Sequence, residues 1–314
     1  MTIVPMGTEP NIGGMRGGGR RAGSALMAVL WAVIVLSLSV SGWIYWMRER
    51  VLASATDSRG VEALAMARSG IAVAFHPNVK QDSSLLQGVV AEGMEYQVEM
   101  QSEGARLNLA WIFQGEDPRR VNLFKQWLEL VAGLDIATRD RVVACIQDYV
   151  DPDSNPRLNG QEDQGDYHPA NRPLRSVEEL MRIPGAGPLL DLPGWRQFFT
   201  LESTGPIDLM EAGEDLLRIL PGMNEGALQR WVQLRAGMDQ VLHTDDDPVF
   251  QSADQVRSAL GMTKVQWENL APLVTVKEPT IRIRSTGRSG KVVRQVEAVV
   301  RKGNAAPQLR AWIE

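Results

Sequence analysis

The chain has 314 residues, 44% of them hydrophobic, and a net charge of −5, which allows an N-terminal segment and two modest hydrophobic cores. The charge is uneven: residues 102–279 hold 17 Lys and Arg against 28 Asp and Glu, which argues against binding of a nucleic-acid backbone there. A single cysteine, Cys145, excludes an internal disulfide, and its apolar neighbours predict a small buried side chain.

The stretch from Ser24 to Met47 contains no charged residue. As a helix it would span about 36 Å, enough to cross a hydrocarbon core of about 30 Å. Residues 1–23 contain three arginines and one glutamate, so the positive-inside rule places that end in the cytoplasm. We therefore expect one membrane crossing, with everything after Arg48 outside.

Three interpretations fit this segment. A secretory signal would be cleaved near Ser39-Val40-Ser41, but the apolar run is longer than a signal peptide requires. The second interpretation is an uncleaved membrane anchor.

The third interpretation rests on Arg20-Arg21-Ala22-Gly23 directly before the apolar helix, which resembles the leader of type IV pilins and pseudopilins. That resemblance implies cleavage by a prepilin peptidase after Gly23, leaving Ser24 as the methylated N-terminus. Most pilins have glutamate at the fifth mature position, whereas Ala28 is typical of type II secretion system protein K minor pseudopilins.

Beyond the apolar stretch, small and apolar residues continue at helical spacing to Phe75, so the helix is expected to end near His76-Pro77. Residues 94–101 alternate apolar and polar side chains and predict a strand, followed by a second short strand at 105–109. Strand character returns at 274–276 and continues over 280–285 and 292–300.

Between these strands the period is helical. The predicted helices span residues 121–132, 137–149, 176–181, 193–199, 213–220, 224–234, 252–260 and 264–270. Ser252 and Thr263 are predicted N-caps, and Ser176 with Glu179 predicts a capping box.

Strands that flank a helical block predict an α+β fold: a long N-terminal transmembrane helix and a pseudopilin-type α/β domain interrupted by a large all-α insertion. The expected parts are a cytoplasmic leader (1–23), a transmembrane helix (24–47), a discontinuous α/β domain (48–110 and 273–314) and an inserted helical domain (111–272). This layout again resembles protein K.

An acidic loop carries the densest set of polar side chains. Counted from Asp151, oxygen ligands fall at the spacing of an EF-hand loop: Asp151, Asp153, Asn155, Asn159 and Glu162. Pro156 replaces the usual glycine, so we expect calcium in an irregular loop. The alternative is a solvated acidic turn.

The resemblance to protein K implies calcium in the inserted domain. The residues of this chain that match the family pattern are Asp148, Asp151, Asp153, Gly160, Glu162, Asp163 and Tyr167, and Asp166 adds a further candidate ligand. A second acidic run, residues 245–247, is expected to be a loop.

Two glycine-containing turns, residues 183–187 and 220–226, resemble helix-hairpin-helix turns, but their acidic surroundings favour packing turns. No catalytic motif is present, so no enzyme is expected.

The resemblance implies a minor pseudopilin at the tip of the periplasmic pseudopilus, anchored in the bacterial inner membrane. It would help to initiate pseudopilus assembly and protein export. Its partners would be I- and J-type minor pseudopilins, the major pseudopilin and the prepilin peptidase. The alternatives are a membrane-tethered DNA-binding protein and a generic anchored calcium module.

Overall fold

The computed structural model describes residues 20–303 and 306–314. A single helix, α1 (Arg20–Phe75), contains the predicted apolar stretch and ends where the sequence predicted. Within it, Ala25–Arg50 has a mean hydropathy of 2.2 and no buried side chain, and by length and composition it is able to cross a membrane. Gly23 and Ser24 lie near the start of α1, whereas residues 1–19 of the predicted leader lie outside the described residues.

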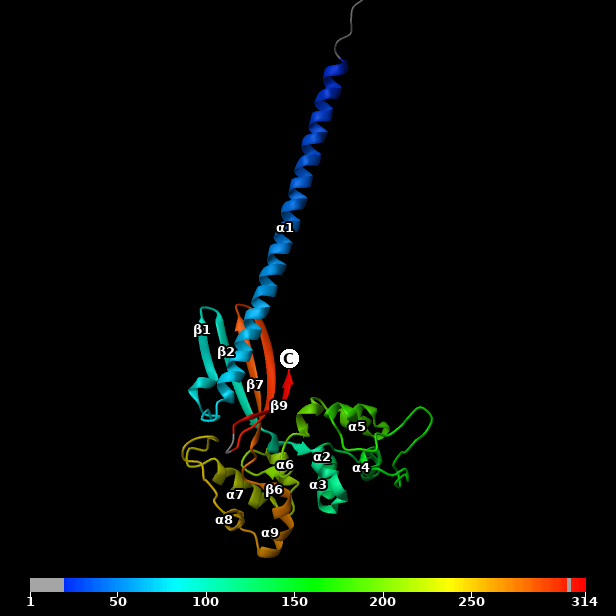
Figure 1. Ribbon diagram of the computed structural model, residues 1–314, viewed down its shortest axis with the longest axis vertical. Helices are drawn as coiled ribbons and strands as arrows, with labels where there is room; N and C mark the ends of the chain where they lie inside the picture. Colours follow the sequence, from blue (N-terminus) through cyan, green and yellow to red (C-terminus); the bar gives the residue numbers. More distant parts are fainter. Residues whose placement is uncertain (1–19, 304–305) are drawn as a thin grey trace, which may run out of the picture. The chain divides into compact units, whose positions relative to one another are not determined.

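One antiparallel sheet combines strands from both ends of the chain. Its order is β1-β2-β7-β8-β9, and the strands are β1 (Gln87–Ala91), β2 (Met94–Ser102), β7 (Thr280–Ser289), β8 (Val292–Arg301) and β9 (Gln308–Ile313). In Figure 1 the cyan strand β2 lies beside the orange strand β7. The expected sheet shared by both ends is therefore confirmed, because Val98 pairs with Ser285 across β2 and β7. The short edge strands β1 and β9 were not predicted.

The end of α1 covers this sheet. Ala67, Ile71 and Ala74 form a core with apolar side chains of the strands, among them Val98 and Ile283. Small residues on this face allow the helix backbone to approach the strands closely. Gly70 lies on this face of the helix. In the structure, a Cβ there would lie 2.3 Å from the Ser285 hydroxyl oxygen.

Residues 105–275 hold the second core, which is built around Trp127, Trp231, Phe124 and Phe199. The helices of this part are α2 (Leu109–Ile112), α3 (Pro118–Leu130), α4 (Ile136–Val150), α5 (Gly187–Leu190), α6 (Glu214–Arg218), α7 (Glu225–Arg235), α8 (Ala253–Ala259) and α9 (Lys264–Leu270). Residues 177–182 and 195–198 form 3₁₀ helices.

Two details of this helical part differ from the sequence prediction. It contains two short parallel ladders, which pair β3 (Leu107–Asn108) with β4 (Phe199–Thr200) and β5 (Ile207–Asp208) with β6 (Val274–Thr275). Two-residue strands leave no readable period, so helical spacing alone could not predict them. The second short strand predicted at 105–109 is thus β3, outside the main sheet.

The predicted N-caps have mixed outcomes. Ser252 and Thr263 cap α8 and α9 as expected, and Thr263 forms a capping box with Gln266. The capping box predicted at Ser176 is wrong, because the Ser176 side chain makes no capping hydrogen bond. Glu179 instead accepts hydrogen bonds from Tyr149, Arg172 and the backbone N–H of Arg175. A buried carboxylate gains more from these charged and phenolic donors than from one backbone N–H.

Candidate metal centre in the inserted helical region

Three carboxylates meet where helix α4 ends. Asp148 lies in its last turn, Asp151 caps its C-terminus, and the following loop returns Glu162 to the same place. One oxygen from each residue lies within 4.8 Å of the others. Because the C-terminal end of a helix is the negative end of its dipole, these carboxylates need a nearby cation.

The cluster is largely shielded from water. The Asp148 side chain is fully buried and Glu162 is 8% exposed. Burial raises the pKa of the Glu162 carboxyl, and the negative charges of Asp148 and Asp151 raise it further. A hard cation bound here would lower the pKa of the Glu162 carboxyl again, because it favours the charged carboxylate.

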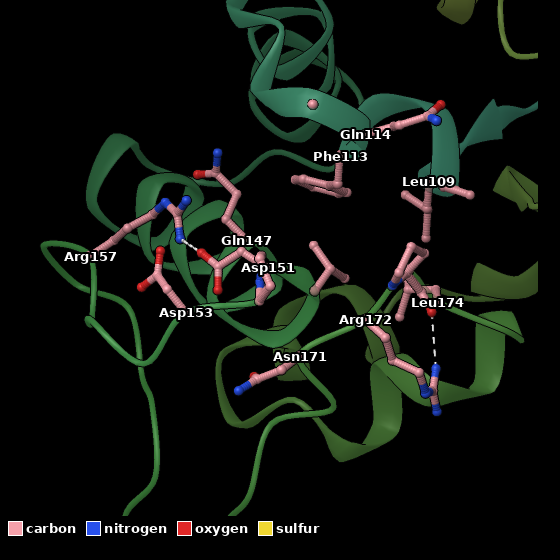
Figure 2. Close-up of a pocket in the computed structure, with 15 residues that line it drawn as sticks. Leu109, Phe113, Gln114, Gln147, Asp151, Asp153, Arg157, Asn171, Arg172 and Leu174 are labelled. Carbon is pink, nitrogen blue, oxygen red and sulfur yellow. Dashed lines mark hydrogen bonds and ion pairs between the residues drawn. The ribbon is translucent and has the colours of Figure 1, made fainter.

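Arg157 supplies part of the missing positive charge. Its Nη1 donates to Asp148 Oδ1 at 2.9 Å and also contacts the Asp151 carboxylate, while its backbone N–H donates to Asp148. Figure 2 shows Asp151 joined to Arg157 at one side of a pocket. This guanidinium was not among the predicted site residues, although a lone arginine in an acidic loop is a signal of an internal ion pair.

Unpaired oxygens remain beside this ion pair. Among the described residues, Asp151 Oδ1, Glu162 Oε1 and the Tyr167 hydroxyl are buried without a hydrogen-bond partner. Buried oxygens of this kind normally have a hydrogen-bond partner. Three such oxygens close together are suited to the oxygen-rich coordination that calcium prefers. The donor set therefore fits a hard divalent cation.

Gly160 leaves room for the cluster. A Cβ on this residue would lie 1.9 Å from Asp148 Oδ2, closer than any non-bonded contact allows. Any larger residue would displace either the loop or the Asp148 carboxylate. The shape of the loop is therefore tied to the position of this acid.

Comparisons with known proteins match the part of the chain that contains this cluster. The family model described as type II secretion system (T2SS), protein K, matches residues 105–190, which include the whole acidic loop. The type II secretion system protein K of Dickeya chrysanthemi is 29% identical over 107 residues, which is 33% of this chain and 28% of the length of that relative. The chain is therefore similar to type II secretion system protein K over the segment that carries the acidic loop.

A solved structure supports the same fold. A chain in the crystal structure of the GspK-GspI-GspJ complex from enterotoxigenic Escherichia coli superposes with a TM-score of 0.58. The alignment covers 85% of this chain and 98% of that chain at 13% sequence identity. This similarity shows that the α+β fold of this chain is shared with that solved chain over most of its length.

The remaining predicted ligands lie apart from the three carboxylates. Asp153 is exposed and accepts hydrogen bonds from the backbone and side chain of Asn155, as in an Asx turn. Asp163 is exposed beside His168, with 2.9 Å between Asp163 Oδ1 and His168 Nδ1, and Asp166 is exposed as well.

Asn159 takes a backbone role in this loop. Its φ of 69° turns the chain, and its carbonyl oxygen lies 3.6 Å from the Cys145 sulfur. Of the eight predicted ligands, the described structure thus brings together Asp148, Asp151 and Glu162. The EF-hand spacing included Asp151 and Glu162 but not Asp148, which the family pattern supplied.

The other features that the sequence pointed to have structural roles. Cys145 is buried as predicted, and a Cβ on Gly185 would come within 2.5 Å of its sulfur, so the first glycine turn packs against α4. The second turn contains Gly222, with φ +83°, between α6 and α7. In the second acidic run, Asp246 accepts hydrogen bonds from the backbone N–H groups of Met238 and Asp239, which identifies the run as a loop.

Proposed function

We propose that this protein is a minor pseudopilin of the type II secretion system, and that it helps to initiate the periplasmic pseudopilus from the fibre tip. The observation that carries the proposal is the match to protein K over residues 105–190, combined with an apolar N-terminal helix. The exposed side chains of Ala25–Arg50 suit storage in a bilayer and later packing against the apolar helices of other pseudopilins. We assign the protein a structural role and no catalytic one.

Ala28 supports a position at the tip. A glutamate at this position in a pilin would offset the N-terminal ammonium of a neighbouring subunit inside the apolar bundle. Ala28 offers no such charge, so a subunit above this one would bury an unpaired cation. The bulky part at residues 105–275 would also obstruct addition of another subunit. Both arguments suit a subunit that ends the fibre.

Partners and orientation follow from the same proposal. The relative of known structure is described as part of a GspK-GspI-GspJ complex. We propose the equivalent I- and J-type pseudopilins and the major pseudopilin as partners of this chain, with the prepilin peptidase as processing enzyme. The arginines of residues 1–23 would keep the N-terminus in the cytoplasm and the bulk of the chain in the periplasm.

We further propose that Asp148, Asp151 and Glu162 hold a calcium ion, with the Tyr167 hydroxyl close by. Calcium would supply the positive charge that three converging carboxylates need at a helix C-terminus. Arg157 would then share the Asp148 carboxylate or turn away from it. Binding stabilises the folded chain by RT ln(1 + [L]/Kd).

Intact-mass analysis tests the pseudopilin proposal. The full chain is extracted from membranes of cells that contain or lack the cognate prepilin peptidase. We expect a product that begins at Ser24, with a methylated N-terminus, only when the peptidase is present. A chain that still begins at Met1 with active peptidase, or one that begins beyond Ser41, would show that this is no pseudopilin. Gly23→Ala should block cleavage, whereas Gly19→Ala in the same leader should not.

A further inference from the structure

A second cavity, distant in sequence from the acidic loop, is unusually rich in arginine. It has a volume of about 630 Å³ and lies between strands β7, β8 and β9 and residues 175–202. Three glutamates line it, against five arginines: Arg106, Arg175, Arg196, Arg282 and Arg284. We call it the arginine groove. A cavity with more cations than anions is a candidate site for an anionic ligand.

Each glutamate of the arginine groove already has a partner. The shortest N–O distances are 2.8 Å for Arg284 and Glu297, 3.3 Å for Arg196 and Glu178, and 3.3 Å for Arg310 and Glu202. Glu297 also accepts from Arg282 at 3.1 Å. Within the part of the chain that the structure describes, these pairs leave Arg106 and Arg175 without a carboxylate as an ion-pair partner.

Arg106 is buried, whereas Arg175 is exposed, and a buried arginine without an ion-pair partner is the less common of the two. Its side chain is only 5% exposed, and its Nε–H has no acceptor among the described residues. The guanidinium donates one described hydrogen bond, from Nη2 to Gln101 Oε1 at 3.2 Å. Burial and the neighbouring Arg282 cation lower the Arg106 pKa, while the nearby Glu103 and Glu297 carboxylates, both paired with Arg282, raise it by less. An arginine rarely stays buried without an anion, since removing its charge from water costs several kcal/mol.

The backbone holds Arg106 in this place. The residue follows a short 3₁₀ turn, Glu103–Ala105, and its N–H donates to the Glu103 carbonyl at 3.3 Å. The next residue, Leu107, is buried in β3. These contacts fix the Arg106 backbone, and from this position the side chain is only 5% exposed, so an anionic partner would have to enter the groove to reach it.

We propose that the arginine groove binds a carboxylate carried on an apolar skeleton, with Arg106 as its principal ligand. The planar guanidinium matches a carboxylate in shape and charge. Apolar side chains such as Phe199, Val299 and Ile313 also line the groove and would contact the carbon skeleton. Arg175, exposed at the rim, would add a second positive charge. The carboxylate belongs either to a small organic acid or to an acidic side chain of another polypeptide.

The test uses the full chain in detergent at constant ionic strength and three probes. These are propionate, an acetylated and amidated Leu-Glu-Leu peptide, and its Leu-Gln-Leu counterpart. Binding is measured by titration calorimetry, and the thermal midpoint by differential scanning fluorimetry. We expect propionate or the Glu peptide to bind and raise the midpoint, and the Gln peptide to do neither. Tighter binding of the Glu peptide than of propionate would identify a polypeptide as the source, and the reverse order a free acid.

Matched variants decide whether Arg106 is responsible. Arg106→Gln should weaken binding about tenfold or more, the equivalent of one charged hydrogen bond. Arg230→Gln, an exposed arginine of α7 outside the groove, should bind as the original chain does. If Arg106→Gln fails to fold, the exposed Arg175→Gln replaces it and should weaken binding to a smaller extent. Absence of binding by the original chain, or equal binding by every variant, would overturn the proposal.

Discussion

Gly287 of β7 lies directly against Ala63 of α1. A Cβ on Gly287 would come within 2.0 Å of the Ala63 carbonyl oxygen and 2.3 Å of the Ala67 backbone nitrogen. Helix and sheet therefore meet backbone to backbone, without an intervening side chain. From the helix side, Gly70 makes a similarly close approach to Ser285. Two glycines from distant parts of the sequence thus set the distance between the helix and the sheet.

Gly287→Ala should destabilise the protein by about 1–3 kcal/mol or more, because a backbone cannot move aside as a flexible side chain can. The measurement is the free energy of unfolding in urea of the full chain in detergent. Gly60→Ala is the matched control, since its Cβ would meet only the Arg294 side chain at 3.4 Å. That change should be neutral or stabilise the helix by up to about 1 kcal/mol. Equal effects of both changes would contradict the close packing.

Calcium should stabilise the protein through the three-carboxylate cluster. At a concentration 100 times the dissociation constant, one bound ion contributes about 2.7 kcal/mol. We expect calcium to raise the thermal midpoint, and a chelator to reverse the rise. Asp148→Asn and Glu162→Gln should each abolish the response, because both carboxylates lie in the cluster. The exposed Asp166→Asn should retain it. A response that depends on Asp166 but not on Glu162 would place the ion elsewhere in the loop.

Asp208 should make stability depend on pH. It is 3% exposed, and burial raises its pKa to about 6, with a smaller contribution from Glu211 and Glu278. A carboxyl with a raised pKa stabilises the fold below its unfolded pKa, and this contribution is lost as the pH rises through about 6. We therefore expect Asp208 to make the protein about 1 kcal/mol less stable at pH 7.5 than at pH 5. Urea unfolding of the original chain and of Asp208→Asn measures the difference. The variant should show a flatter pH dependence, and an unchanged slope would assign the effect to another group.

Arg282 neutralises a fully buried acid. Its Nε donates to Glu103 Oε1 at 2.6 Å, and the Glu103 side chain has no exposed surface. Arg282→Met should destabilise the protein by about 3–5 kcal/mol, since it leaves an uncompensated charge. Adding Glu103→Gln should recover part of that loss in the double variant, measured by urea unfolding. If the two changes are simply additive, the pair contributes no coupling energy.

Much of the architecture followed from local patterns in the chain. An uncharged stretch of 24 residues predicts a membrane-spanning helix from its length and composition alone. Alternation over residues 94–101 predicted β2, and helical spacing predicted α3, α4 and α7, since these elements are long enough to show a period. The family pattern also selected the residues of the cluster, although not which of them meet.

Tertiary structure decided everything that depends on partners distant in the sequence. Arg157 pairs with Asp148 and Asp151 because the loop folds back onto the end of α4, which no spacing rule predicts. Likewise, the edge strand β9 is defined by its pairing with β8 and not by any strong alternation of its own. The sequence by itself determined the long apolar N-terminal helix, the strand at 94–101 and the longer helices, because local hydrophobic periodicity controls these. Only the fold decided which charges are left without a partner, because burial and pairing are properties of residues brought together from distant parts of the chain.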